Sequence, residues 1–96
     1  MLGFRQLRQK IAQLDYSSWS AILKIIQRFE AYIKEAKMLK DGNALEEAFS
    51  ILDSWIIATN ETTKQEQALA PHLRNHVRVT NLTRLIATLQ WLKRLF

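Results

Sequence analysis

Basic side chains in the last third of the chain have the types and spacing best suited to a chemical task. Arg74 and Arg78 lie four residues apart, so a helix would place both guanidinium groups on one face. Asn81 and Arg84 follow close behind. Guanidinium groups bind phosphate oxygens through paired hydrogen bonds, and amide side chains add neutral donors. The pattern therefore predicts a surface that contacts the phosphate backbone of nucleic acid.

Two more groups of basic residues lie in the first forty positions. Lys34, Lys37 and Lys40 end a predicted helix, and we expect them to extend the same nucleic-acid-binding surface. A third group lies in the first predicted helix, at Arg5, Arg8 and Lys10. For any single residue a solvated surface position is the simpler interpretation, whereas the whole set indicates a functional basic face.

The charges are also sorted along the chain. Residues 1–40 carry eight basic and three acidic side chains, residues 41–66 carry one and six, and residues 67–96 carry five and none. The net charge is +5. Segregated charge can place one sign on one side of a fold, and a basic side attracts nucleic acid, anionic lipid or an acidic protein.

His72 and His76 come nearest to a metal site. Their spacing of four residues would let one helix offer both side chains to a transition metal. However, no acidic residue follows Glu66, so no third ligand lies near them in the sequence. We therefore expect two surface histidines, with neither a metal nor a cofactor.

The adjacent carboxylates and the serines do not form a catalytic motif. Glu46 and Glu47 would point about 100° apart on a helix, which suits a helix start better than acid–base chemistry. No nucleophile motif surrounds the serines near a predicted helix start, which are Ser17, Ser18 and Ser20. No phosphate-binding loop is present either. The chain is therefore not expected to be an enzyme.

Trp91 stands apart from the predicted core. On the last helix it lies opposite the stripe of Leu85, Leu89 and Leu92, and Leu95 lies on its side. Tryptophan is enriched where proteins bind one another, so we expect Trp91 and Leu95 to contact a protein partner. Two alternatives remain open: the bundle wraps this helix on both sides, or a nucleic-acid base stacks on the indole.

Length and composition place these residues in one helical domain. The 96 residues include two glycines, one proline and no cysteine, and 48% are hydrophobic. Apolar residues recur with helical spacing, which predicts a single all-α domain over residues 1–96, a compact bundle of four to five helices. The lack of cysteine suits the cytoplasm, and no apolar run approaches the ~20 residues that span a bilayer, so we expect no membrane association.

Capping residues indicate where the first two helices begin and end. The first helix is predicted over about residues 2–14 and the second over residues 18–40. The predicted apolar stripe of the second helix consists of Trp19, Ile22, Leu23, Ile26, Phe29, Ile33 and Ala36. Capping oxygens between them come from Asp15, Tyr16 and Ser17. Gly42 is expected to end the second helix in the left-handed conformation.

The third helix is predicted to begin at a capping box, in which Asn43 caps the helix and Glu46 stands three residues further on. It should fray at residues 59–60. A second capping box, Thr63 with Glu66, then begins a fourth helix.

The last third of the chain carries two apolar stripes that point in opposite directions, and one straight helix could not bury both in the same core. The stripes are Leu69, Leu73 and Val77, and then Leu82, Leu85, Ile86, Leu89, Leu92 and Phe96. Pro71 kinks or begins a helix, and the residues around Thr80 are poor helix formers. We therefore predict a break at residues 80–81 and a final helix over 81–95. The alternative is one continuous helix over 64–95 whose two apolar stripes pack against two separate structural units.

The basic run from Arg74 to Arg84, the basic end of the second helix and the close Leu-Lys-Arg-Leu-Phe give the chain a family resemblance. A short, basic, cysteine-free helical chain of this kind resembles the small subunits of CRISPR effector complexes. The resemblance implies a helical bundle that stacks along a ribonucleoprotein filament. It also implies a basic surface along the path of guide RNA or the displaced target strand, and a role in antiviral defence.

The sequence thus predicts a small helical subunit that binds the backbone of single-stranded DNA or RNA within a larger assembly, together with protein subunits or copies of itself. The alternative is a protein–protein adaptor whose basic face meets an acidic partner and which has no nucleic-acid role. The choice between RNA and DNA, the partner subunits and the pathway stay open at this point.

Overall fold

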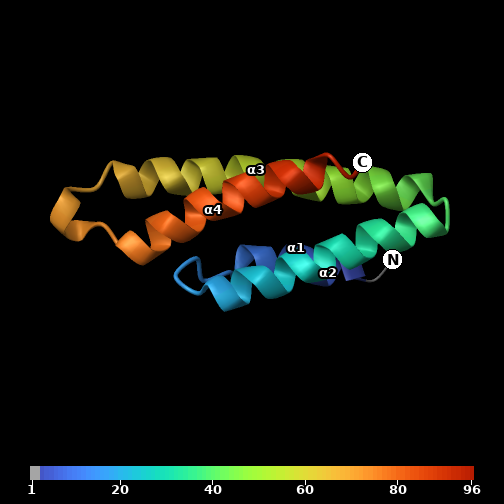
Figure 1. Ribbon diagram of the computed structural model, residues 1–96, viewed down its shortest axis with the longest axis horizontal. Coiled ribbons are helices and arrows are strands. Elements are labelled where there is room, and N and C mark those ends of the chain that lie inside the picture. Colours follow the sequence, from blue (N-terminus) through green and yellow to red (C-terminus); the bar gives the residue numbers. More distant parts are fainter. Residues whose placement is uncertain (1–2) are drawn as a thin grey trace.

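Four α-helices and one short 3-10 helix make up the computed structural model, which describes residues 3–96 (Figure 1). The elements are α1 (Gly3–Ala12), α2 (Trp19–Met38), α3 (Gly42–Gln67), η1 (Pro71–Leu73) and α4 (His76–Lys93). The predicted all-α bundle is therefore confirmed. The predicted start of the first helix at residue 2 lies outside the described residues, and α1 ends at Ala12, two residues before the predicted end.

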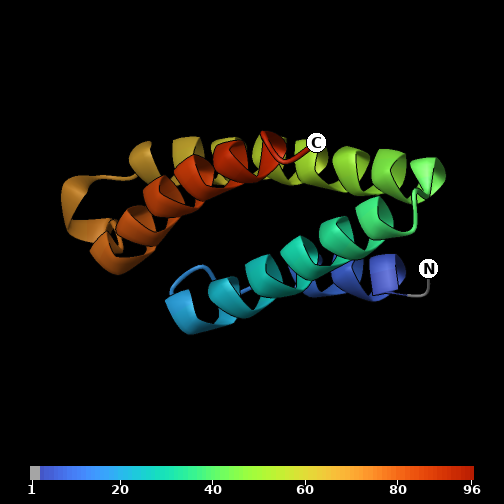
Figure 2. The same ribbon diagram turned by 45° about the vertical axis from the view of Figure 1, so that its right-hand side comes forward.

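The long helix α3 organises the bundle because it packs against each of the other three helices. Both α2 and α4 run antiparallel to it (Figures 1 and 2). The molecule is elongated, with extents of 49 × 20 × 16 Å. The turn between α2 and α3 and the connection between α3 and α4 therefore lie at opposite ends.

The core follows the apolar spacing of the four helices. Trp55 of α3 and Phe29 of α2 are among its largest members and are at most 1% exposed. The other large, fully buried apolar side chains are Phe4, Leu7, Ile22, Ile33, Leu52, Leu82, Leu85, Leu89 and Leu92. Burying one such side chain contributes about 1.5–3 kcal/mol. The predicted stripe of α2 is wrong at one position: Leu23 is exposed, and Ile25 is buried instead on the side of α2 next to α1.

The residues that cap α2 and α3 lie one or two positions away from the predicted ones. Ser18 caps α2, since its Oγ accepts a hydrogen bond from the Ala21 backbone N–H at 3.3 Å. Asp41 caps α3 by accepting from the Ala44 N–H at 3.1 Å. A carboxylate at the N-cap also favours the helix dipole, which explains why Asp41 prevails over a later start.

Two expectations at the turn between α2 and α3 are therefore wrong. Gly42 does not end a helix but is the first residue of α3, and the left-handed position is Lys40, with φ of 53°. The capping box of Asn43 and Glu46 does not form, because both residues already lie inside the helix. Glu46 and Glu47 accordingly stand beyond the first turn.

The predicted interruption of α3 near residues 59–63 is also wrong. The hydroxyl groups of Thr59, Thr62 and Thr63 each donate to the carbonyl four residues earlier, at 2.7–2.9 Å. A threonine hydroxyl satisfied in this way fits inside a helix and offers no cap to a new one. The helix therefore continues from Gly42 to Gln67.

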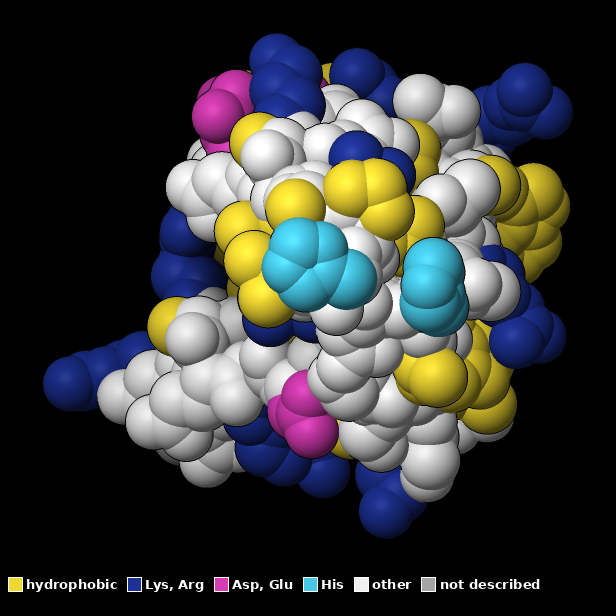
Figure 3. Space-filling view, turned by 90° about the vertical axis from the view of Figure 1, so that its left-hand side faces the viewer, with side chains coloured by type: hydrophobic (Ala, Val, Ile, Leu, Met, Phe, Trp, Pro, Cys, Tyr) yellow, Lys and Arg dark blue, Asp and Glu magenta, His cyan; other side chains and the backbone are white. Residues whose placement is uncertain are grey.

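The chain breaks before α4 rather than inside it. Pro71 begins η1, and Asn75 caps α4 by accepting from the Arg78 N–H at 3.1 Å. Both predictions for this region are thus wrong: α4 is continuous through residues 80–81, and no single helix spans residues 64–95. The second apolar stripe is buried at its leucines, whereas Leu69, Leu73 and Val77 are exposed at the end of the molecule, where hydrophobic side chains surround the histidines (Figure 3).

None of the helices in residues 3–96 combines the length and the apolar character needed to cross a membrane.

Candidate anion-binding cleft

Arg74 does not lie on a helix with Arg78, because η1 and the residues after it separate Arg74 from α4. Its Nε donates to the Leu69 carbonyl and its Nη2 to the Gln67 carbonyl, both at 2.9 Å. The Gln67 carbonyl belongs to the last residue of α3 and the Leu69 carbonyl lies just beyond it, where a helix end leaves acceptors without partners. The predicted shared face of Arg74 and Arg78 is therefore wrong, and Arg74 ties the chain back onto α3.

Arg78 faces the buried carboxylate of Glu66, which is 8% exposed. The Arg78 Nε lies 4.0 Å from Glu66 Oε2, an ion-pair distance too long for a hydrogen bond. The other oxygen, Glu66 Oε1, accepts from the Asn75 backbone N–H at 2.8 Å. Glu66 thus joins the end of α3 to the start of α4, and Arg78 is directed toward it.

Asn81 and Arg84 are also engaged within the fold. Asn81 is 7% exposed, and its Nδ2 donates to the Tyr16 carbonyl at 2.9 Å. The Arg84 guanidinium lies over the indole of Trp19, 4.1 Å from the ring centroid, which is a cation–π contact. Asn81 is therefore not available to phosphate. It contacts the link between α1 and α2, and Arg84 contacts the first residue of α2.

Some of the charges that are segregated along the sequence form ion pairs between α3 and α4. Besides Arg78 with Glu66, Lys93 Nζ pairs with Asp53 Oδ1 at 3.6 Å. The acidic helix α3 packs against α4, which carries several of the basic residues of the last third. The acidic residues of α3 and the basic residues of α4 therefore form ion pairs between these two helices, in addition to charging the surface.

The lysines at the end of α2 do not join the arginines of α4. Lys34 pairs with Glu30 at 3.2 Å, while Lys37 and Lys40 are exposed. These lysines lie near the α2–α3 turn, and Arg74 with Arg78 lies toward the opposite end of the molecule (Figure 1). The single basic surface predicted from the sequence does not form.

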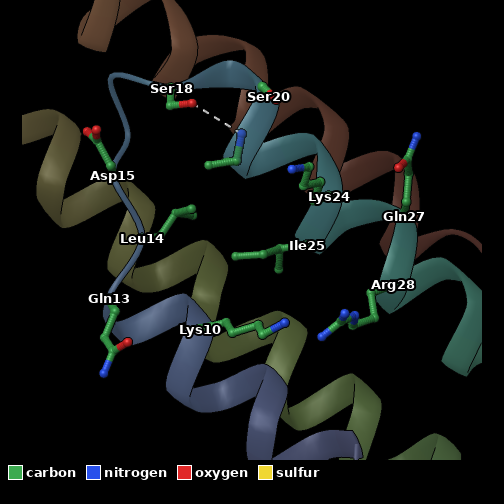
Figure 4. Close-up of a pocket in the computed structure, with 11 residues that line it drawn as sticks. Lys10, Gln13, Leu14, Asp15, Ser18, Ser20, Lys24, Ile25, Gln27 and Arg28 are labelled. Atoms are coloured by element: carbon green, nitrogen blue, oxygen red, sulfur yellow. Dashed lines mark hydrogen bonds between the residues drawn. The ribbon is translucent and has the colours of Figure 1, made fainter.

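Three other cations do come together, in a cleft of about 800 Å³ between α1 and α2. Lys10 reaches from α1, and Lys24 and Arg28 stand one turn apart on α2. In Figure 4 the charged ends of Lys10 and Arg28 are directed toward each other across the cleft. All three side chains belong to exposed residues, and none takes part in an ion pair within residues 3–96.

The rest of the cleft combines an apolar floor with a polar rim. Leu14, Ala21 and Ile25 line it with apolar side chains. The polar residues that line it are Gln13, Asp15, Ser18, Ser20 and Gln27. Asp15 is the carboxylate among them, and its Oδ1 already accepts from the Ser17 N–H at 2.9 Å. Cations therefore outnumber carboxylates in the cleft, and an anion entering it meets a positive field.

Lys24 and Arg28 were not among the predicted site residues, and Lys10 was grouped with Arg5 and Arg8 of the first helix. The signal that could have revealed the pair is their spacing of four residues on α2, on the polar side of that helix. Lys10 could not have been added from spacing, because it comes from another helix.

The remaining candidate residues differ in exposure. Trp91 is 48% exposed, which agrees with its predicted outward position, whereas Leu95 is half-buried against the core and does not share that position. His72 and His76 are both exposed, and they do not share a helix face because His72 belongs to η1 and His76 begins α4. No group of three metal-ligating side chains comes together within residues 3–96.

Comparison with protein-family models, with curated proteins and with solved structures gives no significant match to this chain.

Proposed function

We propose that this protein is a non-enzymatic helical subunit that binds the backbone of single-stranded nucleic acid in the cleft between α1 and α2. The observation that carries the proposal is the convergence of Lys10, Lys24 and Arg28 on one cleft without an ion-pair partner among residues 3–96. Phosphate groups are the anions that Lys and Arg side chains bind through charge and hydrogen bonds.

A polyanion suits this site better than a single small anion. The protein carries a net charge of +5, and further exposed cations lie outside the cleft on α1, α2 and α4. A long strand gains from this field along its whole length, whereas a small anion gains only where it sits. The affinity of the protein for a nucleic-acid strand should therefore decrease strongly as the salt concentration rises.

The test is a titration of a labelled single-stranded oligonucleotide at several salt concentrations. If three cations neutralise three phosphates, the slope of log affinity against log salt should be about −2 on a single strand. A steeper slope would mean that cations outside the cleft also take part. Absence of binding at about 50 mM salt, or binding that does not change with salt, would contradict the proposal.

Trp91 supports a second candidate function, a contact with another protein. Its indole is 48% exposed, and large exposed aromatic side chains mark interface positions. In this adaptor role the basic surface would meet an acidic partner instead of phosphate. Analytical ultracentrifugation of the wild type and Trp91→Ala tests the part played by self-association, and loss of an assembled species in the variant is expected.

The two functions are compatible within a larger ribonucleoprotein assembly, as the resemblance to small CRISPR effector subunits implies. That identity and a role in antiviral defence in the cytoplasm stay predictions. Copurification of the protein with RNA, and effector-complex genes beside its own gene, would support them. A neighbourhood of unrelated genes would count against them.

A further inference from the structure

The cleft between α1 and α2 offers more than positive charge, because its floor is apolar. Leu14 and Ile25 point into the space between the cationic side chains (Figure 4), and Ala21 also lines the cleft. We infer that the cleft receives an unpaired nucleotide, with the base against this floor and the adjacent phosphates on the cations. The inference rests on the proposed function and adds that the base itself is bound.

The floor is a surface that a phosphate group alone would leave uncovered. Ile25 is 6% exposed, and Leu14 and Ala21 are half-buried at the cleft. The flat face of a base is apolar and would displace water from these side chains, which is favourable. Contact with a face that all bases share does not select a sequence.

The rim of the cleft is polar and open to solvent. Gln13, Gln27 and Ser20 are exposed residues of the lining, and in Figure 4 the amides of Gln13 and Gln27 point away from Leu14 and Ile25. A nucleotide that extends from the floor to the rim could exchange hydrogen bonds with these groups at the polar edge of its base, which a hydrocarbon chain could not do. The occupant is therefore planar and apolar on its faces, polar at its edge and attached to phosphate.

The size of the cleft is consistent with this occupant. Its volume of about 800 Å³ falls in the range of roughly 300–1,000 Å³ that is usual for small-molecule sites. A base inside a duplex is stacked and paired, so it cannot enter such a cleft without first leaving the helix. The cleft should therefore discriminate against duplexes.

The experiment compares three labelled probes of equal length: a single strand of deoxythymidine, the same strand with abasic sites in place of the bases, and a duplex. The two single strands carry the same phosphates, so they should show similar salt slopes. The intact strand should bind at least about fivefold more tightly than the abasic strand, because contact of the base with the apolar floor is added. The duplex should bind more weakly than the intact strand.

Each result decides a separate question. Equal affinity for the intact and abasic strands would overturn the inference while leaving backbone binding in place, and failure of all three probes to bind would overturn the proposed function. Lys24→Gln with Arg28→Gln should weaken both single strands and bring their affinity ratio toward one. Trp91→Ala should leave that ratio unchanged; a ratio that falls to one in this variant would place the base at Trp91 and overturn the assignment to the cleft.

Discussion

Glu66→Ala probes the junction at which α3 ends and α4 begins. Glu66 Oε1 accepts from the Asn75 N–H at 2.8 Å, and Oε2 lies 4.0 Å from Arg78 Nε. Alanine removes both contacts and leaves the backbone N–H of the residue that caps α4 without its partner. The substitution therefore tests whether the residues around Arg78 hold the fold together.

The expected cost follows mainly from the hydrogen bond. A hydrogen bond to a charged group contributes about 1.5–3 kcal/mol. The ion pair adds little, because the Arg78 side chain is 40% exposed and the two atoms are 4.0 Å apart. We expect Glu66→Ala to lower the free energy of unfolding by about 2–3 kcal/mol.

Urea denaturation followed by circular dichroism measures this change. For a small domain the free energy falls by about 1–3 kcal/mol per molar urea, so the midpoint should fall by roughly 1–3 M. Glu61→Ala is the matched control: Glu61 lies on the same helix, its side chain is 61% exposed, and it pairs with the exposed Lys64 at 3.7 Å. The control should lose less than about 0.5 kcal/mol. Equal midpoints for the two variants would refute the role assigned to Glu66.

Two further pairs of substitutions test the packing by the same denaturation assay. Gly3→Ala would bring a methyl group into the ring of Tyr32 and should cost about 1–2 kcal/mol. Gly42→Ala meets open space at the start of α3 and should stabilise by about 0.4–1 kcal/mol. Trp55→Ala empties a fully buried site and should cost about 3–5 kcal/mol, whereas Trp91→Ala should change stability by less than about 1 kcal/mol. The reverse order within either pair would contradict the packing described here.

The fold class could be predicted because it depends on the spacing of apolar residues. Helical spacing shows which side of each segment is apolar, and the leucines of α4 and most of the α2 stripe are indeed buried. The exact core position on α2 could not be predicted at Leu23 and Ile25. That choice depends on where α1 packs beside α2, which is a tertiary contact.

The helix ends were harder to predict, because neighbouring residues compete for the same capping role. Asp41 and Asn43 both offer an N-cap oxygen, and the earlier residue caps the helix. Thr63 resembles a cap in the sequence, yet its hydroxyl donates inside α3. Local sequence patterns therefore identify possible capping residues but do not show which of them caps the helix.

The candidate site was the least predictable feature, because it depends on contacts between residues far apart in the chain. The Asn81 side chain donates to the carbonyl of Tyr16, 65 residues away, so it is not available to phosphate. Likewise Lys10 meets Lys24 and Arg28 only through the packing of α1 against α2. The sequence indicated residue types that can bind phosphate, but it could not show that the fold engages Asn81 or that Lys10, Lys24 and Arg28 line one cleft.

The most direct test compares two variants with the same change in charge on the same helix. Lys24→Gln with Arg28→Gln removes two cations from the cleft, and Lys34→Gln with Lys37→Gln removes two outside it. Affinity for a labelled single strand is measured at about 50 mM salt and at higher salt. The cleft variant should lose about tenfold or more in affinity and about 1.4 from the magnitude of the salt slope, and the second variant should lose less than about threefold. Equal losses in the two variants, or a larger loss in the second, would contradict the assignment of nucleic-acid binding to the cleft.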